Sequence, residues 1–574
     1  MISERRWDGE IVALAVPASA TLAAEPAYLL TDTALVGTLG TEALASLAVA
    51  STIVMAAYTI FIFLTFATTA AVARLLGAGR QRDAAEEGVT ATWLGALLGV
   101  AVALVVLPLA LLLAAVRGDA TPATVPSFAA LGSPSMPFVP HQGFINSTWF
   151  CPGVPIGGTG LSGSVTVANP SDGPLTGQFT VFNDIADTEP VEQRFEVPSR
   201  DTLSLDPASL QPAGSYLSVM VEITGGGGLV EQQANHPDGS AVSPCSNSTS
   251  SAWYFADNYT LNDSREDLVI TNPFPDDAII DVSFASNDGE RTPPQLEGVP
   301  VAGHSVYVVD EKFLAKDEAV LAVSIVASRG RVVAGRAQQY LGERQGYSMS
   351  LGSPAGSAGW WFADGENDGS NYERYSIYNP SDQEAVVQPV FLGVTSDTFN
   401  NDIEPITIAP HQVASLSISD VPELPTGRHG AQFSSLTGTP IVVERAITRR
   451  AGDGFATTVV RGVEQYFAEP GYFRWSMAIG TDLAVDNVLV VLNLSFADAT
   501  VAVKALGPGG EVDLPGLEAV ALPAGGVITI AIPDQAAALG HPLVVMGTQP
   551  IVVERLLPRG AELRGRSGSL ALPG

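Results

Sequence analysis

The stretch GWWFADGENDGSNYERYSIYNPSD, residues 359–382, contains the pattern that decides the fold of most of this chain. It opens on an aromatic cluster at Trp361, continues through a polar segment and closes with a short strand-like run that ends at Asn379. A proline follows that asparagine. Because proline cannot donate a hydrogen bond to a β-ladder and disfavours helix in the residue before it, the Asn-Pro pair indicates the end of a strand.

The same pattern occurs four times in the C-terminal three quarters of the chain. The aromatic openers are TWFCPG, AWYFAD, GWWFAD and FRWSMA, at Trp149, Trp253, Trp361 and Trp475. The strands that end in asparagine are VTVANPSD, LVITNPFP, YSIYNPSD and LVVLNLSF, at Asn169, Asn272, Asn379 and Asn493. Each copy closes with a β-branched strand, namely GGLVEQQ, GRVVAGR, GTPIVVERAI or GTQPIVVERLL. The repeat length is about 105 to 115 residues, which indicates one small domain per copy.

Short alternating strands broken by Gly, Pro, Asn and Asp fill each copy, and helical periodicity is rare. Strands at spacings of about ten residues predict an all-β sandwich. We therefore expect four tandem β-sandwich units, at residues 146–247, 248–355, 356–468 and 469–574, arranged as a rod or a compact stack. Residues 117–145 are rich in Pro, Ser and Ala and are expected to be a linker.

Two features of the repeats could be functional or structural, and we expect both to be structural. Each repeated tryptophan is expected to fill a core rather than to form a platform for a ligand. The two IVVER strands contain the pairs Glu444-Arg445 and Glu554-Arg555, which we expect to form ion pairs and not a catalytic site.

The acidic segment ADGENDGSNYERY, with Asp364, Glu366 and Asp368, resembles a calcium loop at first sight. It has Tyr375 where a calcium loop needs a glutamate at its twelfth position. We therefore expect a solvated loop there.

Three apolar stretches near the N-terminus are long enough to cross a bilayer, which requires about 20 residues. The second contains no charge between Glu42 and Arg74, and the third lies between Glu87 and Arg117. The fold class expected for the whole chain is therefore mixed: an α-helical membrane segment of three transmembrane helices at residues 1–116, followed by all-β repeats.

Arginines predict the orientation of these spans, because basic residues concentrate on the cytoplasmic side of a membrane. The arginines that flank the spans are Arg5, Arg6, Arg74, Arg80 and Arg82. They place the N-terminus and the connection between the second and third spans in the cytoplasm. An odd number of spans then leaves everything after residue 117 outside the cytoplasm.

The first span contains two carboxylates, Glu25 and Asp32, and is interrupted by Pro17 and Pro26. A carboxylate inside a span is costly and is often functional. Prolines bend a helix and leave carbonyl groups unpaired. These residues leave two interpretations open: a proton or cation site beside a kink, or carboxylates that lie at the membrane interface and are solvated.

Several motifs of this segment occur together in one known family. They are the Glu25-Pro26 pair, the D-T-A-x-V-G run from Asp32 to Gly37, the L-G-x-x-x-L-A pattern from Leu39 to Ala45, and the A-R-x-x-G-A-G turn from Ala73 to Gly79. With them, residues 1–116 resemble the first three helices of a multidrug and toxic compound extrusion (MATE) transporter of the DinF type. The resemblance implies a cation-coupled antiporter with twelve helices in two lobes. It also implies that Asp32 binds a proton or sodium ion, with Glu25 as a possible accessory.

Residues 146–574 resemble an uncharacterised family of anchored, exported actinobacterial proteins that share the W-[FY]-C-P-G opening found here at Trp149. That resemblance implies an envelope location and no particular activity. Members of that family normally have one anchoring helix. The chain is therefore expected to be a fusion, either natural or created by a gene-model join near residue 113.

Composition limits the remaining functions. The net charge of -32, from 60 acids and 28 bases, disfavours binding to nucleic acid. The two cysteines, Cys151 and Cys245, lie in the segment expected to be exported and are expected to pair. The six histidines are scattered, and no catalytic motif is present. We therefore expect no metal, no cofactor and no enzymatic activity.

Two functions from different classes follow. The first is a multi-pass membrane-anchored envelope protein that displays an acidic β-repeat region for binding or spacing. Its partners would be the lipid bilayer and an envelope polymer or protein. The alternative is a cation-coupled multidrug antiporter, if the N-terminal segment belongs to or assembles a complete transporter. Such transport sites are built between helices of a full bundle, with a proton or sodium ion as the coupling partner.

Overall fold

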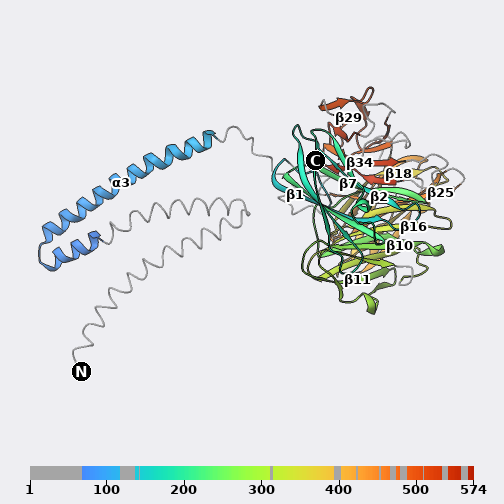
Figure 1. Ribbon diagram of the computed structural model, residues 1–574. Coiled ribbons are helices and arrows are strands. Elements are labelled where there is room, and N and C mark those ends of the chain that lie inside the picture. The colour runs from blue at the N-terminus through green and yellow to red at the C-terminus, as the bar shows by residue number, and fades with distance from the viewer. Residues whose placement is uncertain are drawn as a thin grey trace. The chain divides into compact units, whose positions relative to one another are not determined.

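The computed structural model describes residues 67–116, 136–140, 142–310, 315–393, 403–421, 424–451, 454–465, 473–478, 488–507, 510–532, 541–557 and 567–574. The chain divides into two compact parts, which we call the helical part (Met1–Thr124) and the β part (Val125–Gly574). The described residues of the helical part are mainly helix, and those of the β part are mainly strand (Figure 1).

The helical part contains a helix at residues 67–77 and the helix α3 (Gln81–Val116). A tight turn joins them, in which Gly79 adopts a φ of +75° and its amide donates to the Leu76 carbonyl at 3.0 Å. Arg80 Nε donates to Asp83 Oδ2 at 2.5 Å, so the turn and the first turn of α3 are tied together. The predicted third span coincides with the C-terminal part of α3.

Of the helices that the structure describes, none combines the length and apolar character needed to span a membrane. The predicted first span and most of the second lie outside the described residues. The same holds for Glu25 and Asp32.

In the β part, the described strands form eight antiparallel sheets, two in each successive repeat. In the first β unit the sheets have the orders β1-β6-β3-β4 and β5-β2-β7-β8. Its strands are β1 (Gln142–Pro155), β2 (Ser162–Ala168), β3 (Leu175–Asn183), β4 (Val191–Val197), β5 (Thr202–Leu205), β6 (Tyr216–Gly226), β7 (Leu229–His236) and β8 (Gly239–Pro244).

The second β unit repeats this arrangement with the orders β12-β11-β15-β9 and β14-β10-β16-β17, and with β13 paired to β11. Its strands are β9 (Ala252–Asn258), β10 (Arg265–Asn272), β11 (Ala278–Ser286), β12 (Gly289–Arg291), β13 (Val299–Val301), β14 (Ser305–Asp310), β15 (Leu321–Arg329), β16 (Val333–Tyr340) and β17 (Gly346–Leu351).

The third β unit has the orders β21-β20-β23-β18-β26 and β22-β19-β24-β25. Its strands are β18 (Gly359–Asn367), β19 (Tyr372–Asn379), β20 (Ala385–Leu392), β21 (Ile406–Ile408), β22 (Gln412–Ser417), β23 (Gly427–Ser435), β24 (Val442–Ala451), β25 (Gly454–Arg461) and β26 (Val463–Glu464).

The fourth β unit has the orders β30-β29-β33-β27-β36 and β32-β28-β34-β35, with β31 paired to β29. Its strands are β27 (Arg474–Met477), β28 (Val488–Asn493), β29 (Ala499–Gly507), β30 (Gly510–Asp513), β31 (Val520–Leu522), β32 (Val527–Ala531), β33 (Leu543–Gly547), β34 (Ile551–Leu557), β35 (Ser567–Leu570) and β36 (Leu572–Pro573).

In each unit the repeated asparagine is buried and its side chain bonds to the backbone of two separate segments. Asn169, a representative copy, is fully buried, and its Nδ2 donates to the carbonyls of Gly173 (2.8 Å) and Pro198 (2.9 Å). Its Oδ1 accepts from the amide of Ser171 at 2.9 Å. The equivalent residues Asn272, Asn379 and Asn493 make the same bonds to carbonyls four and about thirty residues later. The asparagine therefore holds its own turn and a distant strand, which apolar residues could not do.

The repeated tryptophan fills the core, as predicted, but its register in the third unit differs from the expected one. Trp253 Nε1 donates to the Val332 carbonyl at 2.8 Å, and the equivalent bond in the third unit is made by Trp360, to Ile441 at 2.8 Å. Trp361 packs instead with the core of the fourth unit. Because neighbouring side chains of a strand point to opposite faces, a shift of one residue exchanges these two roles.

The four β units close into a ring. The second sheet of each unit contacts the opening strand of the unit before it, so that β16 contacts β1, β24 contacts β9 and β34 contacts β18. The same contact joins β7 of the first unit to β27 of the fourth. The first and last described segments of the β part also meet, because the Val139 amide donates to the Pro573 carbonyl at 2.8 Å. Figure 1 shows the C-terminus next to β1 and β7.

The centre of the ring is formed by the last strand of each second sheet. β8, β17, β25 and β35 contact one another in cyclic order. They enclose a cavity of about 30 Å³, lined by Val242, Met349, Val460, Leu570 and their neighbours. A space of that size holds one or two water molecules and no larger ligand.

Residues placed in the expected linker belong to the β part. Met136 is buried, with 2% of its surface exposed, in the core of the fourth unit. The Phe138 carbonyl accepts a bond from Asn247 Nδ2 at 2.8 Å, and β1 begins at Gln142. Apolar residues between the prolines of this segment supply the contacts, although the segment has no periodicity that would reveal them.

Buried ion pairs cross the junctions between units. Arg336 of the second unit forms a bidentate pair with Glu444 of the third, at 3.0 and 3.1 Å. Arg445 of the third unit pairs with Glu554 of the fourth at 2.7 Å, and both partners are almost fully buried. Burial alone would lower the pKa of Arg445, but Glu554 and Asp364 raise it well above its ordinary value. The predicted ion pairs of the IVVER strands are therefore confirmed, with partners in neighbouring units.

The glutamates of these pairs also bind the backbone of the preceding unit. Glu444 Oε2 accepts from the amides of Ala256 and Asp257, each at 2.8 Å. Glu554 Oε1 accepts from the amide of Ala363 at 2.7 Å. The pair at the ring closure is looser, with Arg555 Nη1 3.9 Å from Glu231 Oε2. Each glutamate thus fixes the position of one unit against the next.

The expected solvated loop at Asp364 is wrong. Asp364 lies within β18, is fully buried and accepts hydrogen bonds from Arg428, Arg445 and Arg449. Burial would raise the pKa of Asp364, yet the three arginines hold it well below its ordinary value. The arginines come from β23 and β24, which the local sequence cannot show. Asp368 does lie in an exposed turn, where it accepts from the Ser370 amide at 2.7 Å.

We expect Glu444→Gln to destabilise the β part strongly, because it removes the carboxylate that pairs directly with the buried Arg336. The loss should be about 3–5 kcal/mol. Chemical denaturation of residues 125–574 would measure it. The matched control is Asp172→Asn, since Asp172 pairs with Arg200 but is 91% exposed, and it should cost about 0–1 kcal/mol. Equal effects of the two substitutions would contradict a structural role for the junction pair.

Candidate ligand-binding pocket

The junction between the first and second units lacks the buried ion pair. When the closing strands of the four units are matched, Gln232 stands where the later units have the arginine of the pair. Gly335 stands where they have the glutamate. Gln232 Nε2 donates to the Pro152 carbonyl at 2.9 Å. A side chain at Gly335 would meet that same carbonyl at 2.9 Å, so glycine is required for the close approach of β1. The junction is therefore packed by backbone and proline where the others are charged.

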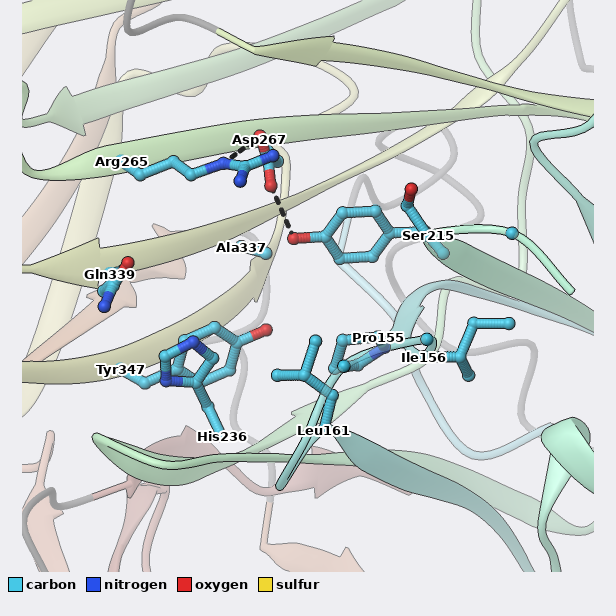
Figure 2. A pocket seen from close by; sticks show the side chains of 14 residues that line it. Pro155, Ile156, Leu161, Ser215, His236, Arg265, Asp267, Ala337, Gln339 and Tyr347 are labelled. Carbon is cyan, nitrogen blue, oxygen red and sulfur yellow. Dashed lines mark hydrogen bonds and ion pairs between the residues drawn. The ribbon is translucent and has the colours of Figure 1, made fainter. Parts of the chain in front are cut away.

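A pocket with a volume of about 260 Å³ opens at this junction (Figure 2). It is lined from the first unit by Pro155, Ile156, Gly157, Gly158, Leu161, Gly214, Ser215, Tyr216 and His236, and from the second by Arg265, Asp267, Ala337, Gln339 and Tyr347. One side is thus built from the loops around β2 and β6, and the other from β10, β16 and β17. The volume is slightly below the range of about 300–1,000 Å³ typical of ligand pockets, which suits a small ligand.

Glycines shape the rim of the pocket. Gly157 has a φ of +82°, and a side chain there would come within 2.7 Å of the Gly214 carbonyl. Gly214 itself has a φ of +117°. Both conformations favour glycine over any residue with a side chain. The two loops can therefore approach closely and leave the space beside them open.

A carboxylate with two donors forms the polar wall. Tyr216 OH donates to Asp267 Oδ2 at 2.7 Å, and Arg265 Nε donates to Asp267 Oδ1 at 3.1 Å. Burial raises the pKa of Asp267, and the bonds from Tyr216 and Arg265 only partly offset that rise. The pKa of Tyr216 is raised well above its ordinary value by burial and by the nearby Tyr347 and Asp267. Tyr216 therefore remains a hydroxyl donor at neutral pH.

An aromatic pair forms the opposite wall. The rings of His236 and Tyr347 stack with centroids 4.7 Å apart and planes 4° from parallel. The backbone amide of Asp238 donates to His236 Nδ1 at 3.1 Å, which leaves the ring hydrogen on Nε2. Burial lowers the pKa of His236, although Asp238 opposes the shift. The imidazole is therefore neutral at pH 7.

Tyr347 contributes a polar atom that the fold does not use. Its side chain is only 3% exposed, and its hydroxyl has no hydrogen-bond partner among the described residues. In Figure 2 this hydroxyl points into the space that the lining residues surround. A buried hydroxyl without a partner costs about 1–3 kcal/mol, so it is a group that a ligand would satisfy.

The corresponding space at the next junction is filled. Counting back from the repeated asparagine, Asp267 corresponds to Arg374 of the third unit. Arg374 is buried and pairs with Asp257 of the second unit at 2.6 Å. Burial would raise the pKa of Asp257, but Arg374 lowers it overall. At the second junction an ion pair thus occupies the place that corresponds to the pocket of the first junction.

The cysteines singled out in the sequence do not line this pocket. Cys151 and Cys245 form a disulfide in the first unit, with Cα atoms 4.6 Å apart, that joins β1 to the segment after β8. No group of three or more His, Cys, Asp or Glu side chains within the described ranges is placed to hold a metal ion. Sequence reasoning missed the pocket, because its residues come from strands of two units. The one available signal was the departure of Gln232 and Gly335 from the Glu-Arg pattern of the later repeats.

The fold and the pocket place this chain among repeat proteins. Its β part is a closed ring of four β-sandwiches, with a pocket at one junction. The chain belongs to the family of unknown function DUF5719, which matches residues 146–335 and 228–456, together more than half of the chain. The MatE family matches residues 17–135. Both resemblances inferred from the sequence are therefore confirmed, and the MatE match indicates that the N-terminal segment associates with a membrane.

Solved structures resemble only portions of the chain. Thermotoga maritima 1070 is 18% identical with a TM-score of 0.16, and the match covers 19% of this chain and 95% of that protein. The Anabaena sensory rhodopsin transducer is 20% identical with a TM-score of 0.14, over 16% of this chain and 87% of its own. A Streptomyces avermitilis alpha-L-rhamnosidase complexed with L-rhamnose is 10% identical with a TM-score of 0.11. The match covers 67% of this chain and 55% of that protein. No curated protein sequence matches the chain.

We expect the pKa of His236 to lie below 6.5, because burial disfavours the imidazolium ion. Asp238→Asn should lower it further, since the substitution removes the negative charge that favours protonation. Titration of the histidine ring signals by NMR in the wild type and the variant would measure both shifts. A pKa above 6.5, or an upward shift in the variant, would contradict the described environment.

Proposed function

We propose that this chain is a membrane-associated envelope protein that displays its β part outside the cytoplasm for binding. The observation that carries the proposal is the pocket at the first junction, the place where the ring replaces a buried ion pair with an open site. The next two junctions are closed by Arg336–Glu444 and Arg445–Glu554, and the junction of the fourth unit with the first has the looser Arg555–Glu231 pair. A closed ring with a pocket at its first junction supports a binding or spacing role.

Two observations support a location outside the cytoplasm. The disulfide between Cys151 and Cys245 suits an oxidising compartment. The net charge of -32 keeps a displayed domain soluble and away from anionic lipid. The proposed topology has three spans within residues 1–116, a cytoplasmic N-terminus and the β part on the far side of the bilayer.

The described charges of the β part support a role without catalysis. Asp257, Asp364, Glu444 and Glu554 are buried, and arginines compensate them. Arginines hold the pKa values of Asp257 and Asp364 below the ordinary range, so these two carboxylates are poor general acids, because they do not hold a proton near neutral pH. Their arrangement serves the junctions between units.

The MatE match favours a second candidate, a cation-coupled antiporter in which Asp32 takes up a proton or sodium ion. The match covers residues 17–135, and the described chain from Gln142 onward forms β-strands. An antiporter of this kind would need helices beyond those of residues 17–135 to enclose a pathway. Anchoring needs only burial of the apolar spans, so we favour the display function.

We expect protease added to intact cells, or to spheroplasts where a wall blocks access, to remove the β part and leave the first 116 residues attached to the membrane. The reason is the outward topology that the flanking arginines favour. Immunoblots against each part would measure the products, with a cytoplasmic protein as the control for lysis. Full protection of the β part in intact spheroplasts would refute outward display.

We expect Asp32→Asn to leave membrane insertion and surface display unchanged, because anchoring does not use the carboxylate. Cells with the wild-type chain should show no proton- or sodium-dependent efflux of a cationic dye. Fluorescence of the retained dye, with and without an ionophore, would measure transport. Efflux that occurs with the wild type and disappears with Asp32→Asn would establish the antiporter in place of the display function.

A further inference from the structure

We propose that the pocket between the first and second β units binds a neutral sugar ring, as the ligand of the binding role proposed above. This inference rests on that proposed function and specifies its ligand class. It is carried by three features of the pocket: an unpartnered buried hydroxyl, a mixture of donors and acceptors on one wall, and a stacked aromatic pair on the other.

The polar groups match a polyhydroxylated ligand. Tyr347 presents a hydroxyl without a partner, Asp267 offers carboxylate lone pairs and Arg265 offers guanidinium hydrogens. Gln339 is oriented by its bond to Asp238 Oδ2 at 2.6 Å. Each sugar hydroxyl both donates and accepts, so adjacent hydroxyls can satisfy a wall on which the two kinds of group alternate. An apolar ligand would leave these groups unsatisfied.

The apolar groups match the carbon face of a sugar. His236 and Tyr347 stack in parallel, and Leu161, Pro155 and Ala337 complete the lining. Small ligand sites typically combine such apolar surface with a few polar groups that fix orientation. The hydroxyls of a pyranose lie around its edge and its C–H bonds on its faces, so one ring can meet both walls.

The charges around the pocket disfavour strongly ionic ligands. Within the lining, Asp267 and Arg265 form an ion pair and His236 is neutral. Asp310 Oδ2 lies 3.7 Å from Arg265 Nη2, and Asp238 Oδ2 accepts a hydrogen bond from Gln339 Nε2. An anionic sugar would meet these acids, and a cation would have to displace Arg265 from its partners. A neutral ring avoids both penalties, and a pocket of about 260 Å³ has room for a single one.

The test uses the full chain in detergent and measures binding by calorimetry and by saturation-transfer NMR. The probes are the methyl glycosides of glucose, galactose, mannose and N-acetylglucosamine, with glucuronate and glucosamine as charged comparators. Two neutral polysaccharides, dextran and mannan, distinguish a residue within a polymer from a free sugar. We expect at least one neutral glycoside or polymer to bind, and the charged comparators to bind more weakly or not at all.

Tyr347→Phe removes only the unpartnered hydroxyl and should weaken binding about 2- to 12-fold. The matched control is Tyr340→Phe. Tyr340 is equally buried, at 1% exposed, and its hydroxyl also lacks a described partner, but it packs against Tyr259 away from the pocket. This control should bind like the wild type. Asp267→Asn should weaken binding about tenfold or more, since it removes a charged acceptor.

Several outcomes would overturn the inference. They are the absence of binding across the neutral panel at millimolar concentration, a preference for either charged sugar, and equal binding by the wild type and Tyr347→Phe. None of these depends on topology, so a failed sugar assay with a correctly displayed β part would refute the ligand class alone. A protected β part in spheroplasts would refute the display function, whatever the pocket binds.

Discussion

The buried arginine–glutamate pair between neighbouring β units is the interaction on which the β part depends. Glu444 binds Arg336 through both carboxylate oxygens and also accepts two backbone amides of the unit before it. Such a pair adds little net free energy, because both charges lose their hydration. It does penalise every other arrangement of the two units, since any shift would leave a charge buried alone. The pair therefore fixes how the units dock.

The ring follows from repetition of that docking. Each sandwich has one of its own tryptophans in its core and closes its own turn with one asparagine, so the units are similar and their faces repeat. When the same contact is made by every unit, the fourth meets the first, and the contact of β7 with β27 completes the circle. The axial strands then pack against one another around a cavity of about 30 Å³.

Function is best sought where the repetition fails. At the first junction Gln232 and Gly335 replace the charged residues, and β1 approaches through Pro152. The disulfide from Cys151 lies on the same strand and gives the first unit a covalent brace. Ion pairs hold the other junctions, and at this one a buried polar group, the Tyr347 hydroxyl, has no partner among the described residues. The MatE-like segment would serve as the anchor of such a ring in the proposed function.

The sequence by itself determined the repeat, the strands that end in asparagine, the buried tryptophans and the two family resemblances, because these depend on local patterns of a few residues. It also indicated ion pairs at Glu444-Arg445 and Glu554-Arg555. Only the tertiary structure decided that these charges join different units, that Asp364 is buried among three arginines and that Trp360 takes the core position. The pocket likewise needs Tyr216 and Asp267, 51 residues apart, to meet across a junction. Such contacts are set by how whole sandwiches dock, and docking depends on surfaces that no short stretch of sequence contains.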